Sequence, residues 1–194
     1  MIHTQCDKLI VSGSRAALIG SRKTPYRMLN MMTSIGNKLS DDGIIGISGG
    51  APGADRAFMT RCKGAIIIPY NGCFGLWHDS ERIFSLDKMP TQIIIKAYLQ
   101  AKSVAPWITE QKDIVQRLYS RNALQVLNLS CMSPVDFVLY WAPEVNGKVK
   151  GGTAIAVNIA RKHRIPTFNL ANKEVYSYFQ KYLGEPSSLE DLFG

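Results

Sequence analysis

Short, largely apolar runs alternate with helix-like segments along the chain, and this order limits the possible folds. Such runs occur at Ala16–Gly20, Ile44–Ser48, Ala65–Pro69, Asp136–Trp141 and Ile165–Leu170. Because the first three lack the polar alternation of a half-exposed strand, we expect strands that are buried on both faces. The sequence therefore predicts an α/β fold: a Rossmann-like, doubly wound, mainly parallel sheet of about five or more strands flanked by helices.

Helices are expected in most of the segments between these runs. We predict them at residues 25–39, 54–62, 91–104, 114–127, from 153 onward, and at 173–183. Residues 91–104 are ambiguous, because three successive isoleucines favour a strand, whereas the Ala, Gln and Lys content favours a helix. Thr24 is expected to cap the first helix, with Pro25 in its first turn. Residues 70–89 and 145–150 are expected to be loops.

Length and composition indicate one ordinary globular domain. The chain has 194 residues, of which 46% are hydrophobic and 20% charged, and we expect residues 1–184 to form a single nucleotide-binding domain. Residues 185–194 are acidic and are expected to form a flexible tail. No apolar stretch approaches the roughly 20 residues of a membrane helix, and the first residues do not resemble a signal peptide. We therefore predict a cytoplasmic protein without a membrane partner.

Neither a metal nor a cofactor is predicted. Cys6, Cys62, Cys73 and Cys131 are scattered, with no C-x-x-C pair and no matching histidine spacing. The net charge of +8 favours an anionic partner, either a nucleotide or a nucleic acid. Nucleic acid is the less favoured of the two, because the chain has no long Lys/Arg run and no basic–aromatic alternation.

Two glycine-rich turns carry the strongest functional indication. The residues of the first are Gly20, Ser21, Arg22, Ser48, Gly49, Gly50, Gly53 and Asp55, and those of the second are Gly151, Gly152 and Thr153. Each piece follows a predicted strand and precedes a predicted helix, an arrangement in which open backbone N–H groups and a helix N-terminus receive a phosphate. A parallel sheet would bring these strand ends to one edge. We therefore predict that both turns form one cleft for a phosphorylated ligand.

Several side chains near these turns have more than one possible role. Asp55 would repel a phosphate, so we expect it to cap the following helix or to bind a ribose hydroxyl. Thr153 can cap its helix or donate its hydroxyl. Trp141, at the end of a strand, could stack on a base or pack on its own sheet. Arg121 and Asn122 are further candidates for the same edge.

Together these segments resemble the SLOG superfamily, which includes the DNA-processing protein DprA/Smf, the LOG phosphoribohydrolases and the YpsA-like proteins. The first turn looks like that of the YpsA-like branch. The resemblance is closest to the circularly permuted, DprA-like proteins common in phage genomes. It is carried by Arg121-Asn122, Ser133-Pro134-x-Asp136-Phe137-Val138 into Trp141, Gly151-Gly152-Thr153 and Ile165-Pro166-x-Phe168-Asn169-Leu170.

This resemblance extends over residues 16–170 and implies a SLOG-like domain that binds a nucleotide or a nucleotide-derived small molecule. The protein would act as a sensor or a sequestering protein, and relatives with this sheet often form homo-oligomers. Some relatives instead cleave an N-glycosidic bond, for which a carboxylate stabilises or traps the sugar cation. The LOG pattern has a Glu just after its glycine turn, whereas this chain continues Ala154-Ile155-Ala156-Val157.

Asp55 and Glu81 are the candidate catalytic carboxylates, although no motif fixes either of them. Three functions therefore stay open. The favoured one is binding of a phosphorylated ligand without turnover. The second is an N-glycosidase acting on a nucleoside monophosphate, and the third is DprA-like binding of single-stranded DNA.

Overall fold

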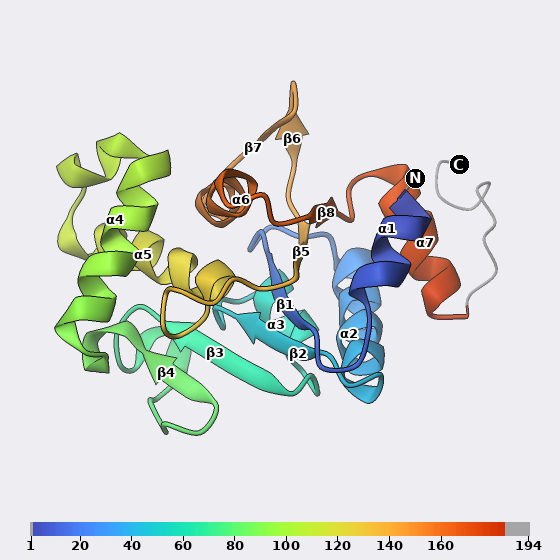
Figure 1. Ribbon diagram of the computed structural model, residues 1–194, viewed down its shortest axis with the longest axis horizontal. Coiled ribbons are helices and arrows are strands. Elements are labelled where there is room, and N and C mark those ends of the chain that lie inside the picture. Colours follow the sequence, from blue (N-terminus) through green and yellow to red (C-terminus); the bar gives the residue numbers. More distant parts are fainter. Residues whose placement is uncertain (1, 185–194) are drawn as a thin grey trace.

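The computed structural model describes residues 2–184, and its centre is a six-stranded parallel sheet (Figure 1). The strands follow the order β4-β3-β2-β1-β5-β8, and every neighbouring pair is parallel. Their bounds are Arg15–Gly20 (β1), Ile45–Ser48 (β2), Gly64–Ile68 (β3), Ile83–Ser85 (β4), Phe137–Trp141 (β5) and Thr167–Asn169 (β8). The Rossmann-like α/β fold expected from the sequence is confirmed.

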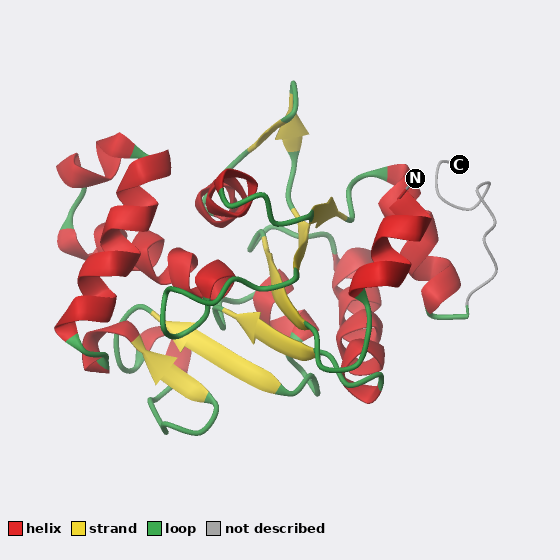
Figure 2. Ribbon diagram, in the orientation of Figure 1, coloured by secondary structure: helices red, strands yellow, loops and turns green. Residues whose placement is uncertain are grey.

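Helices cover both faces of this sheet (Figure 2). One face carries α4 (Thr91–Val104), α5 (Asp113–Leu127) and α6 (Thr153–Lys162). The other carries α1 (Ile2–Leu9), α2 (Tyr26–Asp41), α3 (Ala54–Phe58) and α7 (Lys173–Tyr182). Strand β1 contributes to both cores: Ala17 and Ile19 pack on the first face, and Ala16 and Leu18 on the second. This two-sided burial explains the apolar run.

The order of the strands reverses between β1 and β5, and this reversal positions the site. From β1 the chain crosses through α2 to β2, whereas from β5 it crosses through α6 to β8 on the opposite face. Connections that leave two adjacent strands toward opposite faces open a crevice outside their carboxyl ends. Both of the predicted glycine turns, after β1 and before α6, reach this crevice.

Several local predictions were wrong. Residues 70–89 are not a continuous loop, because they contain β4 and the 3-10 turns Cys73–Gly75 and Leu86–Lys88. Strand β4 is short, and its backbone pairing with β3 is a tertiary contact that local sequence does not encode. A third 3-10 turn at Pro106–Glu110 and helix α1 were not expected.

The expected polar loop at 145–150 is a small hairpin of β6 (Glu144–Val145) and β7 (Lys148–Val149). Helix α3 ends at Phe58, four residues earlier than expected. Residues 91–104 form the expected helix. The Ala, Gln and Lys content of that segment therefore predicted its structure better than the run of three isoleucines did.

Thr24 does not cap α2. Its hydroxyl instead donates to the Ser21 carbonyl oxygen at 2.7 Å, and the N-cap residue Pro25 makes no side-chain capping bond. The hydroxyl therefore stabilises the turn after β1 rather than the helix. The acidic segment 185–194 lies outside the described residues. Within residues 2–184, no helix combines the length and the apolar character needed to cross a bilayer.

Candidate functional site

A cleft of about 610 Å³ lies at the carboxyl ends of β1 and β5. Its walls come from the turn after β1, the glycine loop before α3, helix α5 and the turn before α6. The residues that line it are Ile19, Gly20, Ser21, Arg22, Lys23, Ala51, Asp55, Phe74, Val115, Leu118, Tyr119, Arg121, Asn122, Gln125, Pro143, Lys150, Gly151, Gly152, Thr153 and Ala156. The cleft therefore brings together parts of both glycine turns, as the topology predicted.

The first glycine turn is organised around the buried carboxylate of Asp55. One carboxylate oxygen, Oδ1, accepts a hydrogen bond from the Gly20 backbone N–H at 3.1 Å. The carboxylate also accepts from the backbone N–H groups of Gly49 and Ala51. A ring of backbone N–H groups of this kind is a typical anion site, and here the chain fills it with its own carboxylate. Asp55 therefore does not cap α3, whose N-cap residue is Gly53, so that expectation was wrong, while its contact with a ribose hydroxyl stays a prediction.

Arg121 of α5 forms an ion pair with Asp55 inside the protein. Its Nη1 lies 3.6 Å from Asp55 Oδ2, and each side chain is only 5% exposed. The guanidinium takes the space beside Gly49, where an added Cβ would come within 1.5 Å of Nη1. Glycine is thus required at that position to admit the arginine. The ion pair fastens α5 to the loops that follow β1 and β2.

Burial shifts the ionisation of both partners of this pair. Burial raises the pKa of Asp55 above its ordinary value, while the charge of Arg121 and the backbone N–H donors act against that rise. Burial also lowers the pKa of Arg121, against the opposing effect of the Asp55 charge. Each group therefore depends on the other to remain charged in an environment that disfavours charge.

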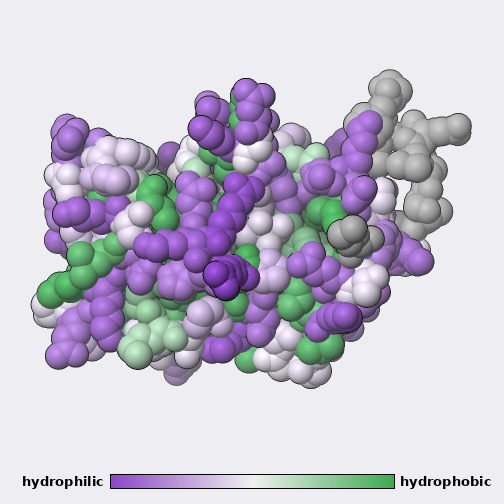
Figure 3. Space-filling model, turned by 45° about the horizontal axis from the view of Figure 1, so that its top comes forward, coloured by the Kyte–Doolittle hydropathy of each residue, from purple (hydrophilic) through white to green (hydrophobic). Residues whose placement is uncertain are grey.

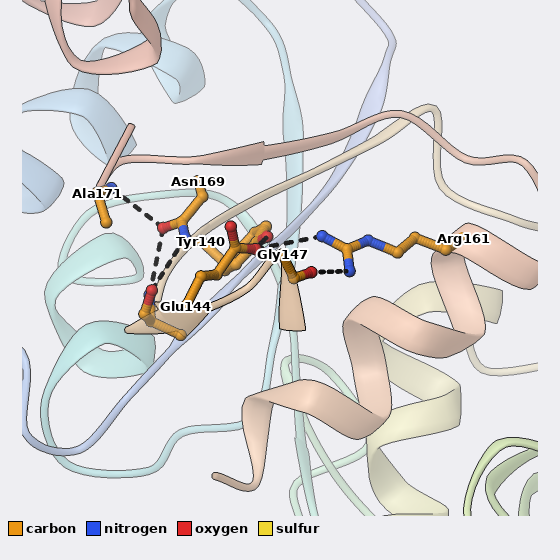
Figure 4. A network of polar contacts seen from close by, with 7 residues as sticks. Tyr140, Glu144, Gly147, Arg161, Asn169 and Ala171 are labelled. Carbon is orange, nitrogen blue, oxygen red and sulfur yellow. Dashed lines mark hydrogen bonds and ion pairs between the residues drawn. The ribbon is translucent and has the colours of Figure 1, made fainter. Parts of the chain in front are cut away.

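The second glycine turn is positioned by a network of polar contacts (Figure 4). The Asn169 side chain bonds the backbone of Ala142 at both its N–H (3.3 Å) and its carbonyl (2.9 Å). Tyr140 donates to Glu144 at 2.8 Å, and Arg161 of α6 binds both Glu144 and the Gly147 carbonyl at 3.2 Å. These contacts fix the β6–β7 hairpin between β5 and α6, and the hairpin ends at the turn.

In this second turn, three successive backbone N–H groups at the start of α6 are unpaired. Gly151 has a φ of +79°, a conformation that favours glycine. Within the described part of the chain, the N–H groups of Gly151, Gly152 and Thr153 donate to no acceptor. Asn122 of α5 holds the turn by donating to the Gly152 carbonyl at 3.0 Å. The expected capping by Thr153 is absent, because the N-cap residue is Gly152 and makes no side-chain bond.

Five of the predicted ligand-binding residues do not line the cleft. Ser48 is fully buried and donates its hydroxyl to the Leu18 carbonyl, while Gly49, Gly50 and Gly53 shape the loop behind Asp55. Trp141 packs on the opposite face of the sheet, with α2 and α3, because it pairs with Gly20 and alternates with Tyr140. The aromatic side chains that do line the cleft are Phe74 and Tyr119.

The candidate catalytic carboxylates are also poorly placed for catalysis. Glu81 is exposed and precedes β4, so it lies toward the amino ends of the strands, away from the cleft. Among the described residues, Asp55 is the one carboxylate that lines the cleft, and its oxygens are engaged by Arg121 and backbone N–H groups. No cluster of three or more metal-binding side chains occurs in the same residues.

Sequence reasoning missed several residues of the cleft, namely Lys23, Phe74, Tyr119, Gln125 and Lys150. Arg121 and Gln125 stand one helical turn apart on α5, next to Asn122, and all three are buried. Polar residues at helical spacing within a buried helix are the signal that could have marked this wall. The predicted residues Gly20, Ser21, Arg22, Asp55, Arg121, Asn122, Gly151, Gly152 and Thr153 do meet in the cleft.

Comparison with known proteins supports the fold. No family model matches the chain, and no curated protein matches it by sequence. Among solved structures, the chain is similar to that of DNA processing protein A from Helicobacter pylori. That structure was described in a study of how the H. pylori protein binds single-stranded DNA. The TM-score is 0.54 and the sequence identity 16%, over 91% of this chain and 83% of that one. The likeness shows a shared DprA-like, Rossmann-like fold.

The buried ion pair predicts a pH-dependent loss of stability when Arg121 is replaced by Met. Asp55 then lacks its counter-charge, so its folded-state pKa rises further above the value in the unfolded chain. A carboxyl with a raised folded-state pKa loses stability as the pH rises from about 4 through that pKa. We expect Arg121→Met to cost about 3–5 kcal/mol at pH 8, and less at pH 5, in urea unfolding.

Arg117→Met is the matched control on the same helix. Arg117 forms an exposed ion pair with Asp113, and the two side chains are 42% and 76% exposed. That substitution should cost less than about 1 kcal/mol at either pH. An Arg121→Met deficit equal at the two pH values would show that Asp55 is not held as a buried charge.

Proposed function

We propose that this protein binds a nucleotide, or another phosphorylated ligand derived from one, in the cleft at the carboxyl edge of the sheet. The observation that carries the proposal is the turn before α6. Three successive backbone N–H groups, those of Gly151, Gly152 and Thr153, are free there at the N-terminus of a ten-residue helix. A phosphate oxygen accepts from such groups, and the helix dipole favours its charge.

The charge of the cleft also favours an anion. Arg22, Lys23 and Lys150 line it and are exposed. The negative charge of Asp55 is balanced by Arg121, so these three cations are left without an acidic counterpart among the lining residues. Hydrophilic side chains also gather across the face that carries the β6–β7 hairpin (Figure 3). A phosphorylated ligand would be attracted to this surface.

The size and the apolar walls of the cleft suit a nucleotide. Its volume of about 610 Å³ lies in the usual range for small-molecule sites. Phe74 and Tyr119 offer flat aromatic surfaces for a base, and an added Cβ on Gly152 would lie only 4.0 Å from the Tyr119 ring. The Tyr119 ring therefore lies beside the turn with the free N–H groups.

We infer binding rather than hydrolysis of this ligand. Glycosidic cleavage needs a carboxylate that can approach the sugar. In this cleft Asp55 is held by Arg121 and by backbone donors, so it acts as an internal anion that shapes the turns. We propose for it the role of a sensor or a sequestering protein. Homo-oligomer formation and a cytoplasmic location stay predictions.

Gly152→Asp separates ligand binding from folding. Gly152 has helical backbone angles and room for a side chain, and Asp is a favourable N-cap residue, so the fold should be kept or slightly stabilised. The new carboxylate would occupy the phosphate position. We expect nucleoside monophosphates to bind wild-type protein in calorimetry, and Gly152→Asp to weaken them about 10- to 100-fold, or ~1.5–3 kcal/mol.

Gly152→Ala is the control, since it replaces the glycine without adding an acceptor that could occupy the free N–H groups. It should retain most of the affinity. If wild type and Gly152→Asp bind nucleoside monophosphates with equal affinity, the phosphate does not bind at this turn, and the proposal is contradicted. Chromatography of the incubated nucleotide should show no free base, and time-dependent release of base by wild type would favour the N-glycosidase instead.

Single-stranded DNA is the second candidate ligand. The observations that favour it are the net charge of +8 and the fold shared with a DNA processing protein whose single-stranded DNA binding has been described. If DNA binds through its phosphates, log affinity should fall linearly with log salt, by about 0.7 per phosphate contacted. Fluorescence anisotropy with a labelled oligonucleotide measures this slope. An absence of binding at low salt would remove this candidate.

A further inference from the structure

Asn122 carries an unpaired hydrogen-bond acceptor in the wall of the cleft. Its side-chain nitrogen, Nδ2, donates to the Gly152 carbonyl at 3.0 Å. A carbonyl oxygen can only accept, so this contact fixes which way round the amide lies. The side-chain oxygen, Oδ1, is therefore directed away from the Gly152 carbonyl. Within the described residues, Oδ1 accepts no hydrogen bond.

This oxygen opens into the cleft and is not sealed in the core. Asn122 is 8% exposed and lines the cleft from α5. In the described chain, the side-chain polar atoms that are both fully buried and unpaired belong to Asn37, Arg82, Arg121 and Gln125. Asn122 Oδ1 is unpaired but not fully buried, so its remaining accessible surface faces the cleft. Most polar groups on such buried side chains have a partner, and a donor on a ligand would supply one here.

The position of Asn122 relates this acceptor to the phosphate turn. The same amide bonds Gly152, whose N–H group is one of the three unpaired ones. Thr153 and Ala156, three residues apart on α6, both line the cleft, so the cleft continues from the start of α6 along this helix, which packs against α5. In a nucleoside 5′-phosphate the ribose directly follows the phosphate, and the base lies farther away. The ribose is therefore the first part of the ligand to reach Asn122.

We propose that Asn122 binds the ribose of the nucleotide, with Oδ1 accepting a hydrogen bond from a hydroxyl of the 2′,3′-diol. Phosphate oxygens are acceptors and cannot pair with Oδ1, whereas a ribose hydroxyl donates. This inference rests on the proposed function and specifies its ligand as a ribonucleotide rather than a deoxyribonucleotide. Single-stranded DNA lacks the donor, because its sugars have no 2′-hydroxyl and their internal 3′-oxygens are esterified.

The test compares AMP with its 2′-deoxy and 3′-deoxy analogues, which keep the base and the phosphate, by calorimetry. Wild-type protein should bind at least one analogue about tenfold more weakly than AMP, because the acceptor of the cleft then loses its donor. Asn122→Ala removes the amide and should also weaken AMP, because the phosphate turn loses its support from α5. The ratio of AMP affinity to analogue affinity isolates the ribose contact from that loss, and it should fall to about one in Asn122→Ala.

Asn158→Ala is the matched control, since Asn158 is exposed on α6 and does not line the cleft. It should keep both the affinity for AMP and the preference for ribose.

Equal affinities of wild type for AMP and both analogues would overturn this inference while leaving the proposed function intact. A ribose preference retained in Asn122→Ala would overturn it as well, by moving the contact to another acceptor such as Asp55. If Asn122→Ala does not fold or binds no nucleotide, the wild-type comparison alone decides. If wild type binds none of the three nucleotides, the proposed function itself fails.

Discussion

The buried ion pair between Asp55 and Arg121 holds together the edge of the sheet that carries the cleft. Asp55 accepts from backbone N–H groups in the loops after β1 and β2, and Arg121 reaches it from α5 across the cleft. Neither charge is favourable at such depth alone, so the two loops and the helix are tied to one geometry. Gly49 is needed for the same ion pair, because any side chain at that position would displace the guanidinium of Arg121.

This arrangement gives the two glycine turns different roles. In the first, the N–H groups of Gly20, Gly49 and Ala51 are directed at the carboxylate of Asp55. The second presents its N–H groups at the start of α6 with no acceptor from the described chain. Since Asp55 is neutralised by Arg121, the exposed cations Arg22, Lys23 and Lys150 have no acidic counterpart among the residues that line the cleft. One turn thus supports the cleft, and the other is available to a phosphate.

Sequence alone predicted the fold and the meeting of both glycine turns at one edge of the sheet, because both follow from topology. The apolar runs required a buried parallel sheet, and the carboxyl ends of its strands brought Arg22 and Gly152 to one edge. Side-chain direction was harder to predict. Trp141 stands at the expected strand end, but its side chain lies on the face of the sheet opposite to α5 and α6. The face that a strand residue occupies depends on its register with the neighbouring strand β1. Gln125 was missed because a polar residue on an amphipathic helix is normally expected to face solvent, although its helical spacing from Arg121 could have marked it.

The central claim is that a nucleotide phosphate binds at the turn before α6, and amide NMR of the isotope-labelled protein tests it most directly. Titration with AMP should shift the backbone N–H resonances of Gly151, Gly152 and Thr153 together, in a saturable manner. The amides around Glu81, at the other edge of the sheet, should not move. If saturating nucleotide leaves the three turn amides unchanged, or shifts only residues outside the cleft, the account is wrong.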